Sequence, residues 1–284
     1  MKQVFTFFVI VLLVAGCGPF PTPTKGQNDV SSQIDTTTEP GKDYSVAQTA
    51  LVIGNSNYEY QQLKNPINDA NAIAESLEKL GFDVTLKTDL DLQAMRNAIY
   101  NFENRLAATS QDDVGLFYFS GHGAQIKGQN YLLPIDNSKI RSEADLERYA
   151  VHADKEVSGM MKVVNAGMNI ITLDACRDNP YAGSTKSLSR GLAQMPPPVK
   201  KRGSLLVAFA TAPGQTASDA GPSGNHGVYT YYLLDVLNKV QPTTLIDEAF
   251  SEVRDLVKQE TEQEPWLQTS LKQFCYFSGK CTRP

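Results

Sequence analysis

The stretch Ile170–Pro180, with the sequence IITLDACRDNP, decides how the rest of the chain is interpreted. Its first four residues are apolar or β-branched, and a polar segment that contains Asp174 and Cys176 follows them directly. A short apolar run bounded by turn-forming residues is typical of a strand buried on both faces of a parallel sheet. The pattern therefore predicts a buried strand that carries a thiol at its carboxyl end.

A second stretch of the same kind is Val114–Phe119, which is followed by Ser120-Gly121-His122-Gly123. In open α/β sheets the functional groups lie just beyond the carboxyl ends of the strands. The two stretches would therefore bring an imidazole and a thiol to one sheet edge. We expect His122 to act as the base and Cys176 as the nucleophile, because a thiol attacks only after it is deprotonated. The backbone amides of Gly123 and Cys176 are the expected oxyanion donors.

The other apolar segments alternate between strand-like and helix-like patterns. Strand-like runs occupy Ala50–Ile53, Phe82–Leu86 and Leu205–Ala210, and the last apolar segment runs from Trp266 to Phe277. Helical spacing of apolar residues occurs over Asn65–Gly81, Leu92–Leu106, about Lys155–Asn165, Val228–Val240 and Leu245–Lys258. Strands that alternate with helices in this way predict a three-layer α/β/α fold with a mostly parallel, six-stranded sheet.

Residues 1–17 are expected to be a lipoprotein signal peptide. Lys2 supplies a positive charge, Val4–Val14 is apolar, and Val14-Ala15-Gly16-Cys17 follows, as in a secretion signal. This ending resembles a bacterial lipobox, whose Cys is lipidated and anchors the chain in a membrane. The alternative is an ordinary signal peptide in which Cys17 is incidental. Gly18 follows Cys17, and the absence of Asp at this position resembles outer-membrane rather than inner-membrane sorting. We therefore expect a lipid-anchored envelope protein on the periplasmic face of the outer membrane.

Residues 18–45 are rich in Pro, Thr, Ser, Gln and Gly, so they bury too little apolar surface to fold and are expected to form a disordered linker. The folded domain is expected to span residues 46–284. The net charge of −5, without a basic stripe, argues against nucleic acid as the main partner. Cys275 and Cys281 are expected to form a disulfide in an oxidising compartment, the alternative being two free thiols.

From about Ala50 to Phe277 the chain resembles the caspase-like superfamily, in particular its bacterial metacaspase- and paracaspase-like members. Four segments carry the resemblance: Ser120-Gly121-His122-Gly123, Asp174-Ala175-Cys176, Asn68-Asp69-Ala70 and Ala210-Thr211-Ala212-Pro213-Gly214. Cys176 follows His122 by 54 residues, which is similar to the order and spacing in caspases. The resemblance implies a caspase-like fold and a cysteine endopeptidase whose His122/Cys176 dyad forms an acyl-enzyme.

The resemblance also concerns the pocket for P1, the substrate residue before the scissile bond. Caspases that cleave after Asp carry Gln two positions before the Cys, whereas this chain carries Asp174. Metacaspase-like enzymes have acidic residues at the positions that match Asp69 and Asp174, a Ser at the position of Ser120, and a preference for Arg or Lys at P1. Two carboxylates bind a guanidinium through charge-assisted hydrogen bonds. The expected partner is therefore a protein or peptide with a basic P1 residue.

Other interpretations of these residues remain open. The domain could be a catalytically silent binding or scaffold module of the envelope, or it could hydrolyse another amide, such as an envelope peptide crosslink. A buried Cys often serves packing alone, and Asp69 could serve only the first turn of a helix. His152 and His226 lie in polar segments and are expected to be solvated, with His226 as a minor alternative base.

The sequence offers little support for a metal or a cofactor. No His, Cys or Asp spacing suggests a metal site, and we expect no cofactor to be required. Ca²⁺ activation is frequent among metacaspases, but the sequence has no EF-hand-like ligand motif. Basic residues in the segment 177–203 are either sites of self-processing or solvated charges. The sequence does not indicate an oligomeric state.

Overall fold

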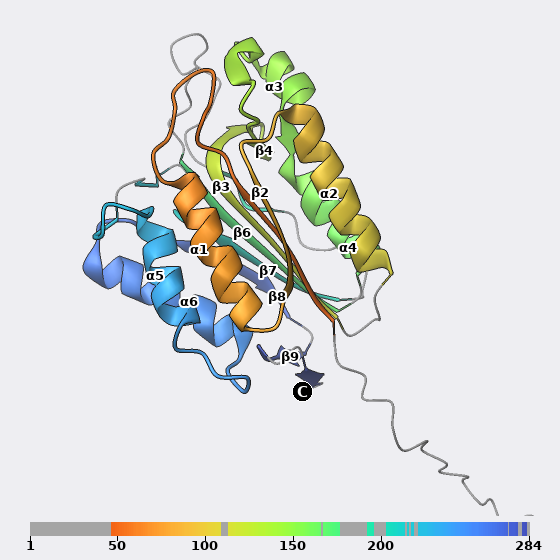
Figure 1. The fold of residues 1–284 in the computed structure, drawn as a ribbon, viewed down its shortest axis with the longest axis vertical. Helices are drawn as coiled ribbons and strands as arrows, with labels where there is room; N and C mark the ends of the chain where they lie inside the picture. Colours follow the sequence, from red (N-terminus) through yellow and green to blue (C-terminus); the bar gives the residue numbers. More distant parts are fainter. Residues whose placement is uncertain are drawn as a thin grey trace, which may run out of the picture. The chain divides into compact units, whose positions relative to one another are not determined.

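The computed structural model describes residues 47–108, 113–165, 167–176, 192–195, 203–213, 215, 217–218, 221–271, 273–277 and 280–282. Within these ranges, six strands lie side by side and form a central sheet (Figure 1). Their order across the sheet is β2 (Asp83–Thr88), β1 (Gln48–Gly54), β3 (Val114–Ile126), β6 (Met168–Cys176), β7 (Ser204–Phe209) and β8 (Trp266–Ser270). All neighbouring pairs are parallel except β7 and β8, which are antiparallel. The prediction of a mostly parallel six-stranded sheet is confirmed.

Strand β3 continues beyond the main sheet. Its last part, Gly123–Ile126, pairs antiparallel with β4 (Gln129–Leu132), which in turn pairs with β5 (Val151–His152). The predicted strand ended at Phe119, because the Gly-rich segment after it has no apolar run. This extension matters for the site, since it carries His122 and Gly123 within a fixed ladder rather than on a loop.

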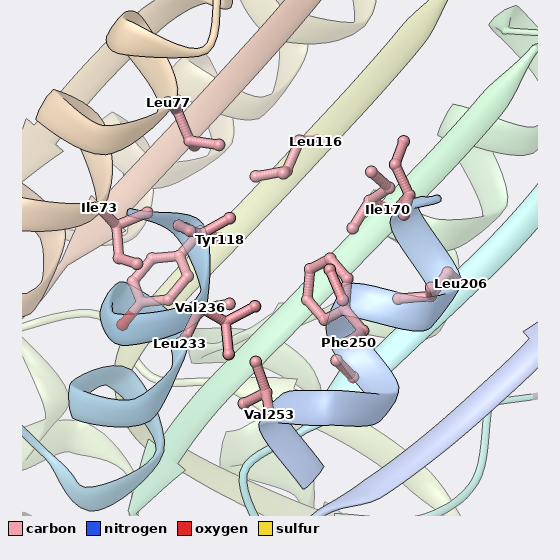
Figure 2. Packing of buried hydrophobic residues seen from close by; sticks show 14 of the residues in the cluster. Ile73, Leu77, Leu116, Tyr118, Ile170, Leu206, Leu233, Val236, Phe250 and Val253 are labelled. Atoms are coloured by element: carbon pink, nitrogen blue, oxygen red, sulfur yellow. The ribbon is translucent and has the colours of Figure 1, made fainter. Parts of the chain in front are cut away.

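Helices cover both faces of the sheet, which gives the predicted three layers (Figure 1). One face is covered by α1 (Pro66–Lys79), α5 (Val228–Leu237) and α6 (Ile246–Glu260), which bury one apolar cluster with alternate residues of the strands. Figure 2 shows Ile73 and Leu77 of α1 and Phe250 of α6 in this cluster, with Leu116 and Tyr118 of β3. Burial of such apolar surface, at about 25 cal/mol per Å², is the main stabilisation of the layers.

The opposite face is covered by α2 (Leu92–Ala107), the π-helical turn η2 (Ala153–Gly159) and α4 (Met160–Val164). The sequence predicted one helix over about Lys155–Asn165, and the structure divides this segment into the π-turn and α4. A short helix, α3 (Glu143–Tyr149), and a 3₁₀ turn, η1 (Asn137–Lys139), precede β5. None of the helices in the described part of the chain is long and apolar enough to cross a membrane.

The last two strands are β9 (Phe274–Cys275) and β10 (Cys281–Thr282), which pair antiparallel. Cys275 and Cys281, the pair expected to form a disulfide, are joined to each other. The amide side chain of Gln48 in β1 donates to the carbonyl of Phe277 at 2.7 Å, so this end is tied to the central sheet. Residues 1–46, with the expected signal peptide, Cys17 and linker, lie outside the described residues, as does most of the segment 177–203.

Candidate active site

Side chains along β3 and β6 alternate between the two faces of the sheet. This alternation determines the face on which each candidate residue lies. Leu116 and Tyr118 on β3, and Ile170 on β6, belong to the cluster beneath α1, α5 and α6. Successive residues of a strand point to opposite faces, so Ser120 and Asp174 lie on that same face, just past the apolar positions. The sheet register also pairs Ser120 with Asp174 as direct neighbours. Two polar residues therefore meet where the apolar core ends.

Asp69 reaches the same place from the first turn of α1, and its carboxylate is almost fully buried. The Ser120 hydroxyl donates to Asp69 Oδ2 at 3.2 Å. The backbone amide of Gly227, which precedes α5, lies 3.2 Å from Asp69 Oδ1 and 3.4 Å from Oδ2. Donors from β3 and from the segment before α5 thus fix this carboxylate, which a role confined to the first turn of α1 would not require.

Asp174 is held from α5. Its Oδ2 accepts hydrogen bonds from the Thr230 amide at 3.2 Å and from the Thr230 hydroxyl at 2.6 Å. The Thr230 hydroxyl is also hydrogen-bonded to the phenol of Tyr118, one of the residues drawn in Figure 2. These bonds orient the Asp174 carboxylate at the end of β6. The structure therefore brings Asp69, Ser120 and Asp174 together, as the sequence analysis expected.

Gly227 lies between the two carboxylates. A Cβ atom added to Gly227 would be 3.2 Å from Asp174 Oδ2 and 3.4 Å from Asp69 Oδ2. The backbone of Gly227 has φ −60° and ψ 155°, which any residue can adopt, so the space is what favours glycine here. Both carboxylates thus face one small region that a side chain at position 227 would fill.

The electrostatic effect of the two acids is visible on neighbouring phenols. The pKa of Tyr118 is raised well above its ordinary value, first by burial and then by the charges of Asp69 and Asp174. The pKa of Tyr229 is raised in the same way, by burial and by Asp174. Burial disfavours charge of either sign, so only the smaller part of these shifts, which comes from the two carboxylates, would favour a cation.

His122 is buried and is held at three points. Its backbone amide donates to the Tyr58 hydroxyl at 2.7 Å, and its ring lies against the Tyr58 ring with 4.4 Å between centroids. Its Nε2 is 2.6 Å from the carbonyl oxygen of Gln61, which has a left-handed backbone with φ 57°. A carbonyl only accepts hydrogen bonds, so Nε2 carries the proton and Nδ1 of the neutral ring is the basic nitrogen.

The backbone around His122 is closely packed. A Cβ atom added to Gly121 would be 2.4 Å from the Tyr58 hydroxyl oxygen, so a side chain there would displace the tyrosine that holds His122. The sheet register places Cys176 directly beside His122. The backbone of Cys176 ends β6, and the strand pairing alone makes these two residues neighbours at the carboxyl edge.

The amide of Gly123 is oriented by the β3–β4 ladder. The Leu133 amide donates to the His122 carbonyl at 2.9 Å, and the register pairs Gly123 with Leu132. This pattern makes Gly123 and Leu132 a pair that exchanges no hydrogen bonds, so the amide of Gly123 points away from β4. Such an amide is suited to stabilise an oxyanion at the strand end.

The two other histidines are not solvated as expected. His152 is buried in β5, its ring against that of Tyr131, with 4.8 Å between centroids. The Nδ1 of His226 is 3.0 Å from Asp69 Oδ1, so His226 belongs to the group formed by Asp69, Ser120 and Asp174, which we call the acidic pocket. Both predictions failed for the same reason: each histidine stands in a polar stretch of sequence, and its environment comes from residues distant in the chain.

Sequence reasoning did not identify Tyr58, Gln61, Thr230 or Gly227. Gln61 acts through its backbone carbonyl, so its residue type carries no signal. Gly227-Val228-Tyr229-Thr230 does carry one, because a glycine before a helix that faces a predicted acidic site indicates close backbone approach. Among the described residues, no three His, Cys, Asp or Glu side chains are grouped so as to hold a metal ion.

Comparison with known proteins gives consistent matches. A family model described as "Caspase domain" matches residues 47–276. The human protein named "Mucosa-associated lymphoid tissue lymphoma translocation protein 1" (Homo sapiens) is 30% identical over 206 residues, which cover 71% of this chain and 23% of the relative. Its homolog in Mus musculus is 28% identical over 219 residues, which cover 75% of this chain and 24% of the relative. The chain spans about a quarter of the length of these curated relatives.

One similar solved structure is that of protein GSU0716 from Geobacter sulfurreducens. It has a TM-score of 0.59 at 15% sequence identity, and the match covers 79% of this chain and 93% of that one. At this identity the likeness concerns the fold alone, and it agrees with the three-layer architecture described above.

Proposed function

Since the chain belongs to the caspase-domain family, we propose that it is a cysteine endopeptidase that cleaves peptide bonds after Arg or Lys. The observation that supports the basic preference is the meeting of the Asp69 and Asp174 carboxylates at Gly227. The register pair Ser120/Asp174 is two pairs along the sheet from the pair His122/Cys176. Both carboxylates already accept hydrogen bonds. An Arg or Lys side chain of the substrate would add charge-assisted hydrogen bonds, which are stronger than neutral ones in a buried site.

In the proposed mechanism, His122 removes the thiol proton of Cys176 through Nδ1, while the Gln61 carbonyl holds Nε2–H. The thiolate then adds to the carbonyl carbon of the scissile bond, and the amides of Gly123 and Cys176 hydrogen-bond the resulting oxyanion. Collapse of this intermediate breaks the C–N bond, and the His122 imidazolium protonates the leaving amine. Water, deprotonated by His122, hydrolyses the acyl-enzyme and releases the acid product.

The acidic pocket would select the substrate in two ways. A guanidinium or ammonium between Asp69 and Asp174 gains charge-assisted hydrogen bonds in a region of low dielectric. An acidic P1 side chain would instead be repelled by both carboxylates, which adds discrimination against it. Gly227 contributes by having no side chain, since even a Cβ atom there would crowd Asp174 Oδ2 at 3.2 Å and Asp69 Oδ2 at 3.4 Å.

The proposal is tested with fluorogenic peptides that differ only at P1, as Arg, Lys, Asp or Leu, incubated with the purified protein. Cys176→Ala serves as the blank, and each assay is run with Ca²⁺ and with a chelator, because we propose that no cofactor is required. Cleavage after Arg and Lys, lost in Cys176→Ala, is the expected result. Cleavage after Asp would retain the peptidase and refute the pocket. Absence of cleavage by folded protein would favour a silent binding or scaffold module.

We also propose that the protein is anchored in the bacterial envelope through lipidated Cys17. The disulfide between Cys275 and Cys281 supports an oxidising compartment. Fractionation of cells that express the wild type or Cys17→Ser tests the anchor: the wild type is expected in the membrane fraction and Cys17→Ser in the soluble periplasmic fraction. Equal distribution of the two forms would refute lipidation at this residue.

A further inference from the structure

The acidic pocket contains a basic group of the protein itself. His226 Nδ1 lies 3.0 Å from Asp69 Oδ1, an oxygen that also accepts from the Gly227 amide. The His226 side chain is 22% exposed, whereas that of Asp69 is 1% exposed. The imidazole therefore approaches the buried carboxylate from the solvent side. A substrate side chain that binds Asp69 must approach the same carboxylate oxygens.

The segment that carries His226 is held in place over this part of the molecule. The Gly221 amide donates to the His226 carbonyl at 2.7 Å, which closes a tight loop. Two side chains that precede Asp69 in sequence hold the loop from the other side. Lys64 Nζ donates to the Gly224 carbonyl at 3.1 Å, and Asn68 Nδ2 donates to the Asn225 carbonyl at 3.3 Å. The loop backbone is thus fixed independently of the imidazole, which can rotate away without loss of these bonds.

We propose that His226 is a pH-dependent cap on the acidic pocket, which competes with the basic P1 side chain of the substrate for the carboxylate of Asp69. This inference rests on the proposed function, since it assumes that Asp69 binds a cationic substrate group. It adds a specificity-determining residue and predicts inhibition at acid pH.

The direction of the effect follows from the charged groups that face His226. These are Asp69 on α1, Asp174 on β6 across Gly227, and Lys64, which bonds the same loop at Gly224. Burial lowers the pKa of His226 and so favours the neutral imidazole, which in its Nδ1–H form donates a neutral hydrogen bond to Asp69. A substrate guanidinium readily replaces this donor because its hydrogen bonds are charge-assisted. At lower pH the imidazolium forms a charge-assisted bond of its own, and the substrate must displace a cation.

A different role for His226 would give the opposite result. If the imidazole stayed in place and packed against the P1 side chain, its removal would weaken substrate binding. If His226 only stabilised the fold, its removal would change KM neither at neutral nor at acid pH. The sign and the pH dependence of the effect on KM therefore decide between these roles.

The first test measures KM for the peptide with Arg at P1 between pH 5.5 and 8 in the wild type, His226→Ala and His226→Gln. Gln can donate a hydrogen bond to Asp69 but cannot become charged. The wild-type KM is expected to rise about three- to tenfold more than that of either variant as the pH falls, because only the wild type gains a competing cation. Parallel pH profiles of KM in all three proteins, or a higher KM in His226→Ala at every pH, would overturn the proposal.

The second test does not depend on catalysis. Benzamidine, an amidinium probe, is titrated into Cys176→Ala while the imidazole signals are followed by NMR. The chain has three histidines, so the signal missing from the His226→Gln form of this variant belongs to His226. Binding is expected to lower the pKa of His226 by the logarithm of the factor by which protonation of His226 weakens benzamidine binding, as linkage requires.

The two tests separate the proposals. Benzamidine binding coupled to His226, without hydrolysis of any peptide by the wild type, would keep the cap and refute the peptidase. Hydrolysis after Arg with a KM that is insensitive to His226 would keep the peptidase and refute the cap. Benzamidine that binds without any change in the pKa of His226 would also refute the cap.

Discussion

Two buried carboxylates of this protein, Asp69 and Asp154, each lie near a histidine, but their surroundings differ. Asp69 is 3.0 Å from the Nδ1 of His226, and its other donors come from β3 and from the residue before α5. Asp154 is 3.9 Å from the Nδ1 of His152, and it accepts from the backbone amide of Asn130 at 2.7 Å and from the Asn130 side chain at 3.4 Å.

The Asp154 group is closed to solvent on both sides. The side chains of His152 and Asp154 are only 10% and 3% exposed. Burial lowers the pKa of His152 and raises the pKa of Asp154, so each group is driven toward its neutral form. Asn130 extends the group to Ala193, whose amide donates to Asn130 Oδ1 at 2.6 Å and whose carbonyl accepts from Nδ2 at 3.0 Å.

The two groups differ in the purpose that a neighbouring Asp and His serve. The Asp154 group fixes the segment Leu192–Met195, and the Leu192 side chain lies 3.3 Å from where a Cβ on Gly123 would be. Through Leu192, the Asp154 group thus supports β3 at Gly123. The Asp69 group instead has a histidine that is 22% exposed, so this group borders on solvent through His226. We interpret the first group as structural and the second as a binding site.

Among the substitutions that distinguish the Asp154 group from the Asp69 group, to which Asp174 also belongs, Asp174→Asn is expected to have the largest effect on activity. This change keeps the shape of the side chain but removes one of the two charges that would bind a basic P1 residue. We expect kcat/KM for the Arg peptide to fall about 10²-fold, as for a buried hydrogen-bonded charge pair that loses one partner. The measurement is steady-state hydrolysis of the Arg peptide, with circular dichroism to verify the fold.

Asp154→Asn is the matched control for Asp174→Asn, since it makes the same chemical change in the other group. It is expected to retain the ratio of Arg to Leu cleavage. Equal losses of that ratio in the two variants would show that the acids act through the fold rather than in the pocket.

A smaller effect on activity and a clear effect on stability are expected for Asn130→Ala. The change removes both hydrogen bonds to Ala193 and leaves buried polar groups unsatisfied, which costs about 3 kcal/mol. For a domain of this size the Tm should fall by roughly 6–12 °C. Thermal unfolding measures the shift, and P1 selectivity is expected to be unchanged. A wild-type Tm for Asn130→Ala would contradict the structural role of this group.

The smallest effect concerns Glu103 of α2, which faces the same side of the sheet as Asp154 and is 9% exposed. Burial, together with the charge of Glu156, raises its pKa from 4.5 to about 7. Between these values the folded state binds a proton that the unfolded state has lost. The stabilising contribution of Glu103 is therefore complete below pH 4.5 and is lost as the pH rises through about 7.

Glu103→Gln removes this titration. We expect the variant to match the wild type at pH 4.5 and to exceed its Tm by about 2–4 °C at pH 8, a modest gain for a partly solvated group. Thermal unfolding over this range measures the difference. A difference in Tm between Glu103→Gln and the wild type that is the same at every pH would show that the carboxyl charge is not the cause of the difference.

The central sheet could be predicted because its strands are defined by local apolar runs. Val114–Phe119 and Ile170–Leu173 each appear in the structure as parts of longer strands, with the polar residues at their carboxyl ends. Helix α3 could have been found as well. Ser142 accepts from the Asp145 amide, which is a capping pattern readable from Ser-x-x-Asp, although only Leu146 of this helix is buried.

Contacts between distant segments could not be predicted from local pattern. Tyr58 binds the backbone of His122, and His226 binds Asp69, across 64 and 157 residues of chain. The burial of His152 depends on β5, which has two residues and therefore no periodicity to detect. Such contacts arise from sheet register and helix packing, which a single sequence specifies only through the whole fold.

The central claim is that the two carboxylates recognise the positive charge of the P1 side chain. The most direct measurement compares kcat/KM for two peptides that differ only in arginine or citrulline at P1, since citrulline is a neutral group of nearly the same shape. We predict a preference for arginine of about 10²-fold or more, reduced in Asp174→Asn. Equal rates for the two peptides would contradict the claim.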